Sequence, residues 1–185
     1  MKNKLLPGSR LLPVFFTAVL ILSLFFPAAE RFVLEQVRDG RIVYCAAFKP
    51  GMEFAVSYIH SVNKSKITDI FKIRDDGVII LDSSRFSSFG AGVASFPEEE
   101  SSDFSVKKDY IDYHDIDRIV DDLVVFVGTI ADHTLILQSG SIPLSSLAKP
   151  QTNLRFLVKK LSAAEIAMYY VMDYLRKGAL NDGKS

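Results

Sequence analysis

The chain has 185 residues, of which 49% are hydrophobic and 24% are charged, the composition of a globular protein with a sizeable core and, by default, one domain. Its 22 basic and 22 acidic residues balance, but three cations precede a long apolar run, so the remainder is acidic by about three charges. An acidic surface excludes nucleic acid and anionic lipid as expected partners.

The N-terminal region is typical of an export signal. Residues 11–29, LLPVFFTAVLILSLFFPAA, carry no charge and follow Lys2, Lys4 and Arg10. The length of this run lies between that of a cleaved signal and that of a spanning helix. Because Pro27 stands where a cleavage site prefers a small residue, we favour an uncleaved anchor. The flanking cations keep the N-terminus in the cytoplasm and place the domain outside the cytoplasmic membrane, in a periplasmic or extracellular position. Cleavage would instead give a secreted protein.

Two strands are predicted within residues 32–48, FVLEQVRDGRIVYCAAF, around the dipeptide Asp39-Gly40. This dipeptide favours a two-residue hairpin, in which both turn positions take positive φ. The single cysteine, Cys45, cannot form an internal disulfide, and we expect a buried thiol within the second strand.

Alternating residues predict further strands beyond the KPG turn. In EFAVSYIH, residues 53–60, one face carries Phe54, Val56, Tyr58 and His60, which we expect to point inward. SKITDIFKI, residues 65–73, and VIILDSS after the RDDG turn continue the pattern. Short strands at this spacing favour antiparallel pairing.

The character of the chain changes over residues 84–122, where acidic residues are dense, and we interpret this segment as an exposed excursion. Its acidic part, residues 98–122, has no assigned role. Strand patterns resume in residues 123–131, 133–138, 141–144 and 153–160.

The C-terminus has the period of a helix. Ser162 and Glu165 form a capping-box pattern, and Gly178 is expected to end the helix. An apolar stripe runs along it. We expect the stripe to cover the sheet or its open end, with docking to a membrane partner as the alternative. Its members are Ile166, Ala167, Tyr170, Val171 and Tyr174.

His60 is the first residue to consider for chemistry. If residues 57–60 and 68–71 are the arms of one hairpin, Asp69 lies across from His60 and could hydrogen-bond with it, with Tyr58 nearby. The pair could be a base and its orienting group, a ligand contact, or a buried imidazole that satisfies its N–H. We favour the structural role.

Other candidate sites have weaker patterns. Ser61 points away from His60 on a strand, so it is poorly placed for hydrolase chemistry, and the GxSxG motif is absent. The FGAG sequence at 89–92 lacks the helix that follows a phosphate-binding loop, and we interpret it as a sharp bend. The three histidines share no metal-ligand spacing, and the aspartate-rich segment lacks a calcium-loop pattern.

Two motifs carry a resemblance to a known family. SYIHSVNKSKITDIF, an apolar strand and then SSFGAGV resemble the domain of unknown function 1850 family, whose pattern is a Y-x-HSV-E turn followed by a SxGAGLP loop. The similarity covers about residues 50–95, with a weaker similarity in residues 127–148, VGTIADHTLILQSGSIPLSSLA. Asn63 replaces the family's glutamate, Lys66 its proline, and Val93-Ala94 its leucine-proline. The loss of that glutamate undercuts any scheme with two carboxylates beside the histidine.

The resemblance implies a small exported protein associated with tripartite (TRAP) transporters of the TAXI type. Its functional candidates here, which would bind a ligand or partner, are Tyr58, His60, Ser61, Val62, Asp69, Gly90, Ala91 and Gly92, with His133 added. We call residues 60–62 the HSV turn and residues 90–92 the GAG loop.

We therefore expect a mainly β protein, an antiparallel β-sandwich or open barrel with one C-terminal α-helix and an N-terminal signal or anchor helix. We expect a signal peptide or membrane anchor at residues 1–29 and a β domain at 30–161. The C-terminal helix, 162–178, is expected to pack on that domain. The expected function is a non-enzymatic accessory of a TAXI-type transporter, without cofactor, metal or catalytic residues. It would contact the membrane subunit or the solute-binding protein through the HSV turn and the GAG loop. The alternative is a small-ligand or metal-binding module that uses His60 and Asp69.

Overall fold

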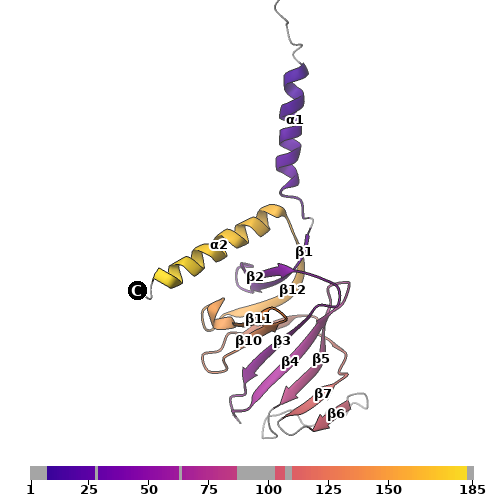
Figure 1. Cartoon of the computed structure of the whole chain (residues 1–185), viewed down its shortest axis with the longest axis vertical. Coiled ribbons are helices and arrows are strands. Elements are labelled where there is room, and N and C mark those ends of the chain that lie inside the picture. Colours follow the sequence, from indigo (N-terminus) through magenta and orange to yellow (C-terminus); the bar gives the residue numbers. More distant parts are fainter. Residues whose placement is uncertain (1–7, 28, 63, 87–102, 107–109, 183–185) are drawn as a thin grey trace, which may run out of the picture. The chain divides into compact units, whose positions relative to one another are not determined.

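The protein is described here by a computed structural model, which defines residues 8–27, 29–62, 64–86, 103–106 and 110–182 (Figure 1). The strands form two antiparallel sheets, and those described do not close into a barrel. The predicted mainly β sandwich with one C-terminal helix is confirmed.

The smaller sheet, sheet A, combines the first two strands of the chain with the last strand and β9. Its strands, in spatial order, are β2 (Ile42–Ala47), β1 (Ala29–Gln36), β12 (Asn153–Leu161) and β9 (Leu123–Phe126). The turn between β1 and β2 is longer than the predicted two-residue turn, because the Gly40 amide donates to the Gln36 carbonyl and Asp39 does not take positive φ. The Asp39 carboxylate instead accepts from the Arg41 amide at 3.0 Å. Cys45 is buried in β2, as predicted.

The larger sheet, sheet B, is built around β3, β4 and β5, which lie side by side in Figure 1. A register shift between Ile70 and Phe71 leaves Asp82 as an extra residue of β5. This β-bulge bends the strand locally. A 3-10 turn, η1 (Leu144–Ser146), follows the sheet's edge strand. The strands in spatial order are β11 (Gly140–Pro143), β10 (Thr134–Leu137), β3 (Glu53–Ile59), β4 (Lys66–Ile73), β5 (Ile79–Phe86), β7 (Ile111–His114) and β6 (Asp103–Val106), with β8 (Arg118–Ile119) paired to β5.

The expected exposed excursion over residues 84–122 is wrong for its described part, because β6, β7 and β8 belong to sheet B. The apolar residues of IDYH alternate with polar ones, and Ile111 and Tyr113 are buried. The acidic residues do not prevent β7 from pairing with β5. The Asp112 carboxylate forms an ion pair with Arg85 on the face of the sheet opposite Ile111 and Tyr113.

The core forms where the inner faces of the two sheets meet. Phe32 of sheet A lies 4.8 Å from the Phe54 ring of sheet B, and Phe54 stacks on Phe156 at 5.7 Å. A second, smaller apolar cluster lies farther along the same face of sheet B. Its buried members are Ile67, Phe86, Ile111 and Tyr113. The predicted inward direction of Phe54 and Val56 is confirmed, because both belong to the core cluster between the sheets.

By contact density the chain divides into Phe32–Val158 and a second unit made of Met1–Arg31 with Lys159–Ser185. The second unit contains α1 (Gly8–Ser23) and α2 (Ala163–Asp182). The capping box is confirmed: the Ser162 amide donates to Glu165 Oε2 at 2.8 Å, and the Glu165 amide donates to Ser162 Oγ at 3.2 Å. Gly178 does not end the helix, which continues beyond it.

Among the described helices, none combines the length and the apolar character needed to cross a membrane.

Candidate functional site

The HSV turn is a compact loop that joins β3 to β4. The His60 amide donates to the Ser65 carbonyl at 2.9 Å, and the Lys64 amide donates back to the His60 carbonyl at 3.0 Å. Inside the turn, the Val62 amide donates to Nδ1 of His60 at 3.3 Å. The half-buried His60 ring therefore helps to hold the shape of the turn by accepting a hydrogen bond. The Ser61 and Val62 side chains are exposed.

The expected pairing of His60 with Asp69 differs from the register of the hairpin. The strand pair starts at Ile59 and Lys66, so Asp69 lies opposite Val56 rather than opposite His60. The HSV turn is part of the connection between Ile59 and Lys66, and Asp69 falls well inside β4. Because directly paired residues share a face, Asp69 is a diagonal neighbour of Tyr58.

Asp69 is the centre of a polar group on the inner face of sheet B. Ser84 lies directly across from it on β5 and donates from Oγ to Asp69 Oδ1 at 2.5 Å. The Tyr58 hydroxyl also donates to this carboxylate, and the Arg118 cation acts on it. Burial is the largest effect on Asp69 and raises its pKa. Smaller effects lower the pKa: the hydrogen bond from Ser84, the charge of Arg118 and the hydrogen bond from Tyr58.

Tyr58 connects this group to a histidine. Burial, followed by the charge of Asp69 and the hydrogen bond to it, raises the pKa of Tyr58 to about 12. The ring of Tyr58 stacks on His133 at 5.3 Å, with an interplanar angle of 29°. Tyr58 therefore remains a neutral hydrogen-bond donor at physiological pH, with one edge on the carboxylate and one face on the imidazole.

His133 is held by the loop that precedes β10. The Ile59 amide donates to the Ala131 carbonyl at 2.8 Å, and the Leu144 amide donates to the His133 carbonyl at 2.8 Å. Gly128 backs the ring, since a Cβ at that position would lie 3.6 Å from His133 Cε1. Nδ1 of His133 is buried and has no hydrogen-bond partner among the residues that the structure describes. Burial lowers the pKa of His133, with a smaller opposing effect from Asp132, so this imidazole is neutral at pH 7.

We name Tyr58, Asp69, Ser84 and His133 the inner polar cluster. Three of its members were sequence candidates, whereas Ser84 was missed because only the pairing of β4 with β5 reveals its place opposite Asp69. His60, Ser61 and Val62 lie in the adjacent HSV turn. Gly90, Ala91 and Gly92 lie outside the described residues.

The inner polar cluster is held together by hydrogen bonds. The Ser84 hydroxyl is buried and donates to Asp69, so it is engaged with a carboxylate and not with a histidine base. Within the described ranges, no group of three or more His, Cys, Asp or Glu side chains could hold a metal ion. A neutral imidazole, a tyrosine hydroxyl and a carboxylate can orient a bound polar group.

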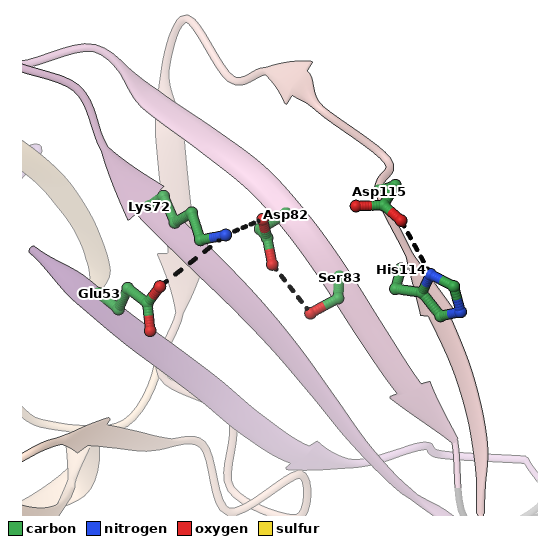
Figure 2. Close-up of polar contacts among 6 residues, drawn as sticks. All are labelled: Glu53, Lys72, Asp82, Ser83, His114 and Asp115. Carbon is green, nitrogen blue, oxygen red and sulfur yellow. Dashed lines mark hydrogen bonds and ion pairs between the residues drawn. The ribbon is translucent and has the colours of Figure 1, made fainter. Parts of the chain in front are cut away.

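The opposite face of sheet B carries a separate set of charges (Figure 2). Lys72 Nζ lies 2.5 Å from Asp82 Oδ1 and 3.8 Å from Glu53 Oε1, and these contacts cross three neighbouring strands. The hydrogen bond to Asp82 is the largest cause of the raised pKa of Lys72. On β7, His114 Nδ1 lies 3.0 Å from Asp115. The charges are paired within each group, and ion pairs at the surface contribute little to stability.

Comparison with known proteins gives one similarity. Residues 54–144 match a family described as a domain of unknown function (DUF1850). The matched segment contains nearly all of sheet B, with the HSV turn and the inner polar cluster. No curated protein and no solved structure matches the chain.

Proposed function

This chain belongs to the domain of unknown function 1850 family, and from that membership we propose that it is a non-enzymatic accessory protein of a TAXI-type TRAP transporter. In this proposal residues 11–29 anchor it in the cytoplasmic membrane, and the β region lies outside the cytoplasm. It contacts the transporter's membrane subunit or its solute-binding protein through the HSV turn and the GAG loop.

The observation that carries this proposal is an exposed apolar rim beside the inner polar cluster. Val62 in the HSV turn is 68% exposed, and Ile130 in the loop before β10 is 73% exposed. Their two loops are joined by the hydrogen bond from Ile59 to Ala131. Large apolar side chains on loops of fixed conformation suit a protein contact, because little entropy is lost when the partner binds.

The non-enzymatic part of the proposal is supported by the engagement of the nearby polar groups. His60 Nδ1 accepts from the Val62 amide, and the Ser84 hydroxyl donates to Asp69. In neither arrangement does a serine hydroxyl donate to a histidine.

Site-specific photo-crosslinking in the native organism tests this contact. A crosslinking residue replaces Val62 or Ile130, and the control places it at Val37, an exposed apolar residue beyond the end of β1. We expect Val62 and Ile130, but not Val37, to capture the membrane subunit or the solute-binding protein. Capture of neither subunit from both rim positions would contradict the proposal.

A small-ligand module is the second candidate; it was expected to use His60 and Asp69, and we now propose His133 as its centre in place of His60. The specific observation is the buried Nδ1 of His133, which has no partner in the described part of the chain and whose ring stacks on Tyr58. A bound polar group could satisfy this atom. Melting of the full chain with short-chain carboxylates, Zn²⁺ or Ca²⁺ tests the candidate, since a ligand bound only to the folded state raises the melting temperature.

A shift that survives His60→Ala but disappears in His133→Phe would support this second candidate. His133→Phe keeps the ring that stacks on Tyr58 while removing both ring nitrogens. The candidate is abandoned if none of these probes shifts the melting temperature of the unmodified chain.

A further inference from the structure

Helix α2 exposes a continuous apolar face. Met168, Val171, Met172 and Leu175 follow the i, i+3, i+4, i+7 spacing of one helix face, and their side chains are 63%, 55%, 55% and 58% exposed. Tyr170 and Tyr174, from the stripe predicted by sequence, are also exposed. Tyr174 borders this face, whereas Tyr170 lies on the other side of the helix, beside Ile166 and Asp173. An exposed set of large apolar side chains of this kind marks an interaction site.

The opposite side of α2 has a different character. Ile166, Tyr169, Asp173 and Arg176 are half-buried and lie on the other side of the helix. Asp173 pairs with Arg176 at 2.5 Å and with Lys177 at 2.7 Å. These two cations share one carboxylate, and with three acidic and two basic residues α2 carries no excess of positive charge. Whatever binds the apolar face is therefore recognised by apolar contact and not by charge.

The start of α2 is tied to the end of the apolar N-terminal segment. The Ala164 amide, in the first turn of α2, donates to the Leu24 carbonyl at 3.0 Å. Next to this contact, Lys160 Nζ lies 3.8 Å from Glu30 Oε1. Both contacts lie within the second unit of the chain. If residues 11–29 are in a membrane, this tether holds the first turn of α2 at the membrane surface.

We infer that α2 lies in the membrane interface as an amphipathic helix, with the face formed by Met168, Val171, Met172 and Leu175 turned into the lipid. The lipid surface covers this face, because the hydrogen bond from Ala164 to Leu24 places the start of the helix beside the end of the apolar segment. Tyrosines suit the headgroup level, where the ring is apolar and the hydroxyl stays hydrated. This inference rests on the proposed membrane anchorage and adds a second attachment to it.

Depth-dependent quenching on the full chain in phosphatidylcholine vesicles tests the inference. Single cysteines are introduced in a Cys45→Ala background, and each carries an environment-sensitive fluorophore. Leu175→Cys reports on the apolar face, and Lys177→Cys, two residues later and on the other side of α2, is the matched control. Leu20→Cys reports separately on the anchor. Circular dichroism of each variant checks that the fold is kept.

We expect quenchers attached to lipid to reduce the fluorescence at Leu175→Cys severalfold more than at Lys177→Cys, and aqueous iodide to show the reverse order. The difference should persist at one chain per vesicle and be unchanged when phosphatidylglycerol is added, because α2 has more acidic than basic residues. Equal access of iodide to the two positions would overturn the inference. Protection at Leu175→Cys only at high protein density or only with transporter subunits would also overturn it, since a protein would then cover the face.

The anchor reporter separates the two proposals. A label at Leu20→Cys that is quenched by lipid, together with a label at Leu175→Cys that is open to iodide, leaves the anchorage intact and rejects the interfacial helix. An unquenched label at Leu20→Cys rejects the anchorage itself.

Discussion

Asp69 is the best point at which to test the inner polar cluster, because three substitutions change its charge and its hydrogen bonds separately. Asp69→Asn removes the charge and keeps polar atoms for both neighbours, since the amide oxygen can accept from Ser84 and the amide nitrogen can donate to the Tyr58 oxygen. Asp69→Ala removes the charge and both acceptors. Asp69→Leu fills the space without any polar atom.

The magnitudes follow from the burial of the two hydroxyls. Ser84 is buried, so the loss of its acceptor costs about 1–3 kcal/mol. Tyr58 is half-buried and recovers part of its loss from water, and we expect about 2–4 kcal/mol in total for Asp69→Ala. Burial raises the pKa of Asp69, so ionisation there opposes folding, and Asp69→Asn should be at least as stable as the unmodified chain at pH 8.

The pH dependence has a definite sign. Because the folded pKa of Asp69 is raised, the native state binds this proton more tightly than the unfolded chain. Protonation of Asp69 therefore stabilises the folded state. This stabilisation is fully present below the pKa of the unfolded chain, about 3.9, and is lost as pH rises through the pKa of the folded state. Asp69→Asn should remove this dependence.

Urea unfolding followed by circular dichroism at pH 4 and pH 8 measures all three variants. If Asp69→Asn destabilises the protein at pH 8 as much as Asp69→Ala does, the charge itself is required, most directly by Arg118, and the assignment of burial as the largest effect is wrong.

Three further predictions concern other parts of the chain. His133→Phe should remove a loss of stability that the unmodified protein shows as pH falls below about 6.5, because burial lowers the pKa of His133 and protonation favours the unfolded chain; melting curves at pH 5 and pH 8 check this. Gly77→Ala should cost about 1–3 kcal/mol in urea unfolding, since φ is +83° and the new Cβ would lie 3.1 Å from Val158; Gly40→Ala, at φ +68° with nothing within 4 Å, should cost less. Ser162→Ala should lower the helical circular dichroism signal and cost about 1 kcal/mol through loss of the capping box, and an unchanged signal would show that the box does not hold the start of α2.

Sequence reasoning succeeded where local periodicity decides the structure. The alternation in residues 53–60 predicts β3 and its buried face, and Ser162 with Glu165 predicts the start of α2. It failed at Gly178, because one glycine inside a helix costs only about 1 kcal/mol and neighbouring residues can carry the helix past it.

The candidate site was predicted only in part, because its geometry depends on pairing between distant segments. Tyr58, Asp69 and His133 were chosen from the sequence, but the register that brings Asp69 next to Tyr58 depends on the length of the HSV turn. Ser84 is opposite Asp69 through a strand pair that no local pattern specifies. His133 reaches Tyr58 through the loop before β10, far away in the sequence.

The position of Asp69 between the two apolar clusters of sheet B has a consequence for cooperativity. Val56, opposite Asp69, belongs to the large cluster, whereas Ile67, two residues before Asp69, belongs to the small one. The four buried residues of the small cluster hold less apolar area than the large cluster does. Native-state amide exchange should therefore reveal a sub-global opening, in which β7 exchanges its hydrogens while β1 and β12 stay protected until the whole domain unfolds.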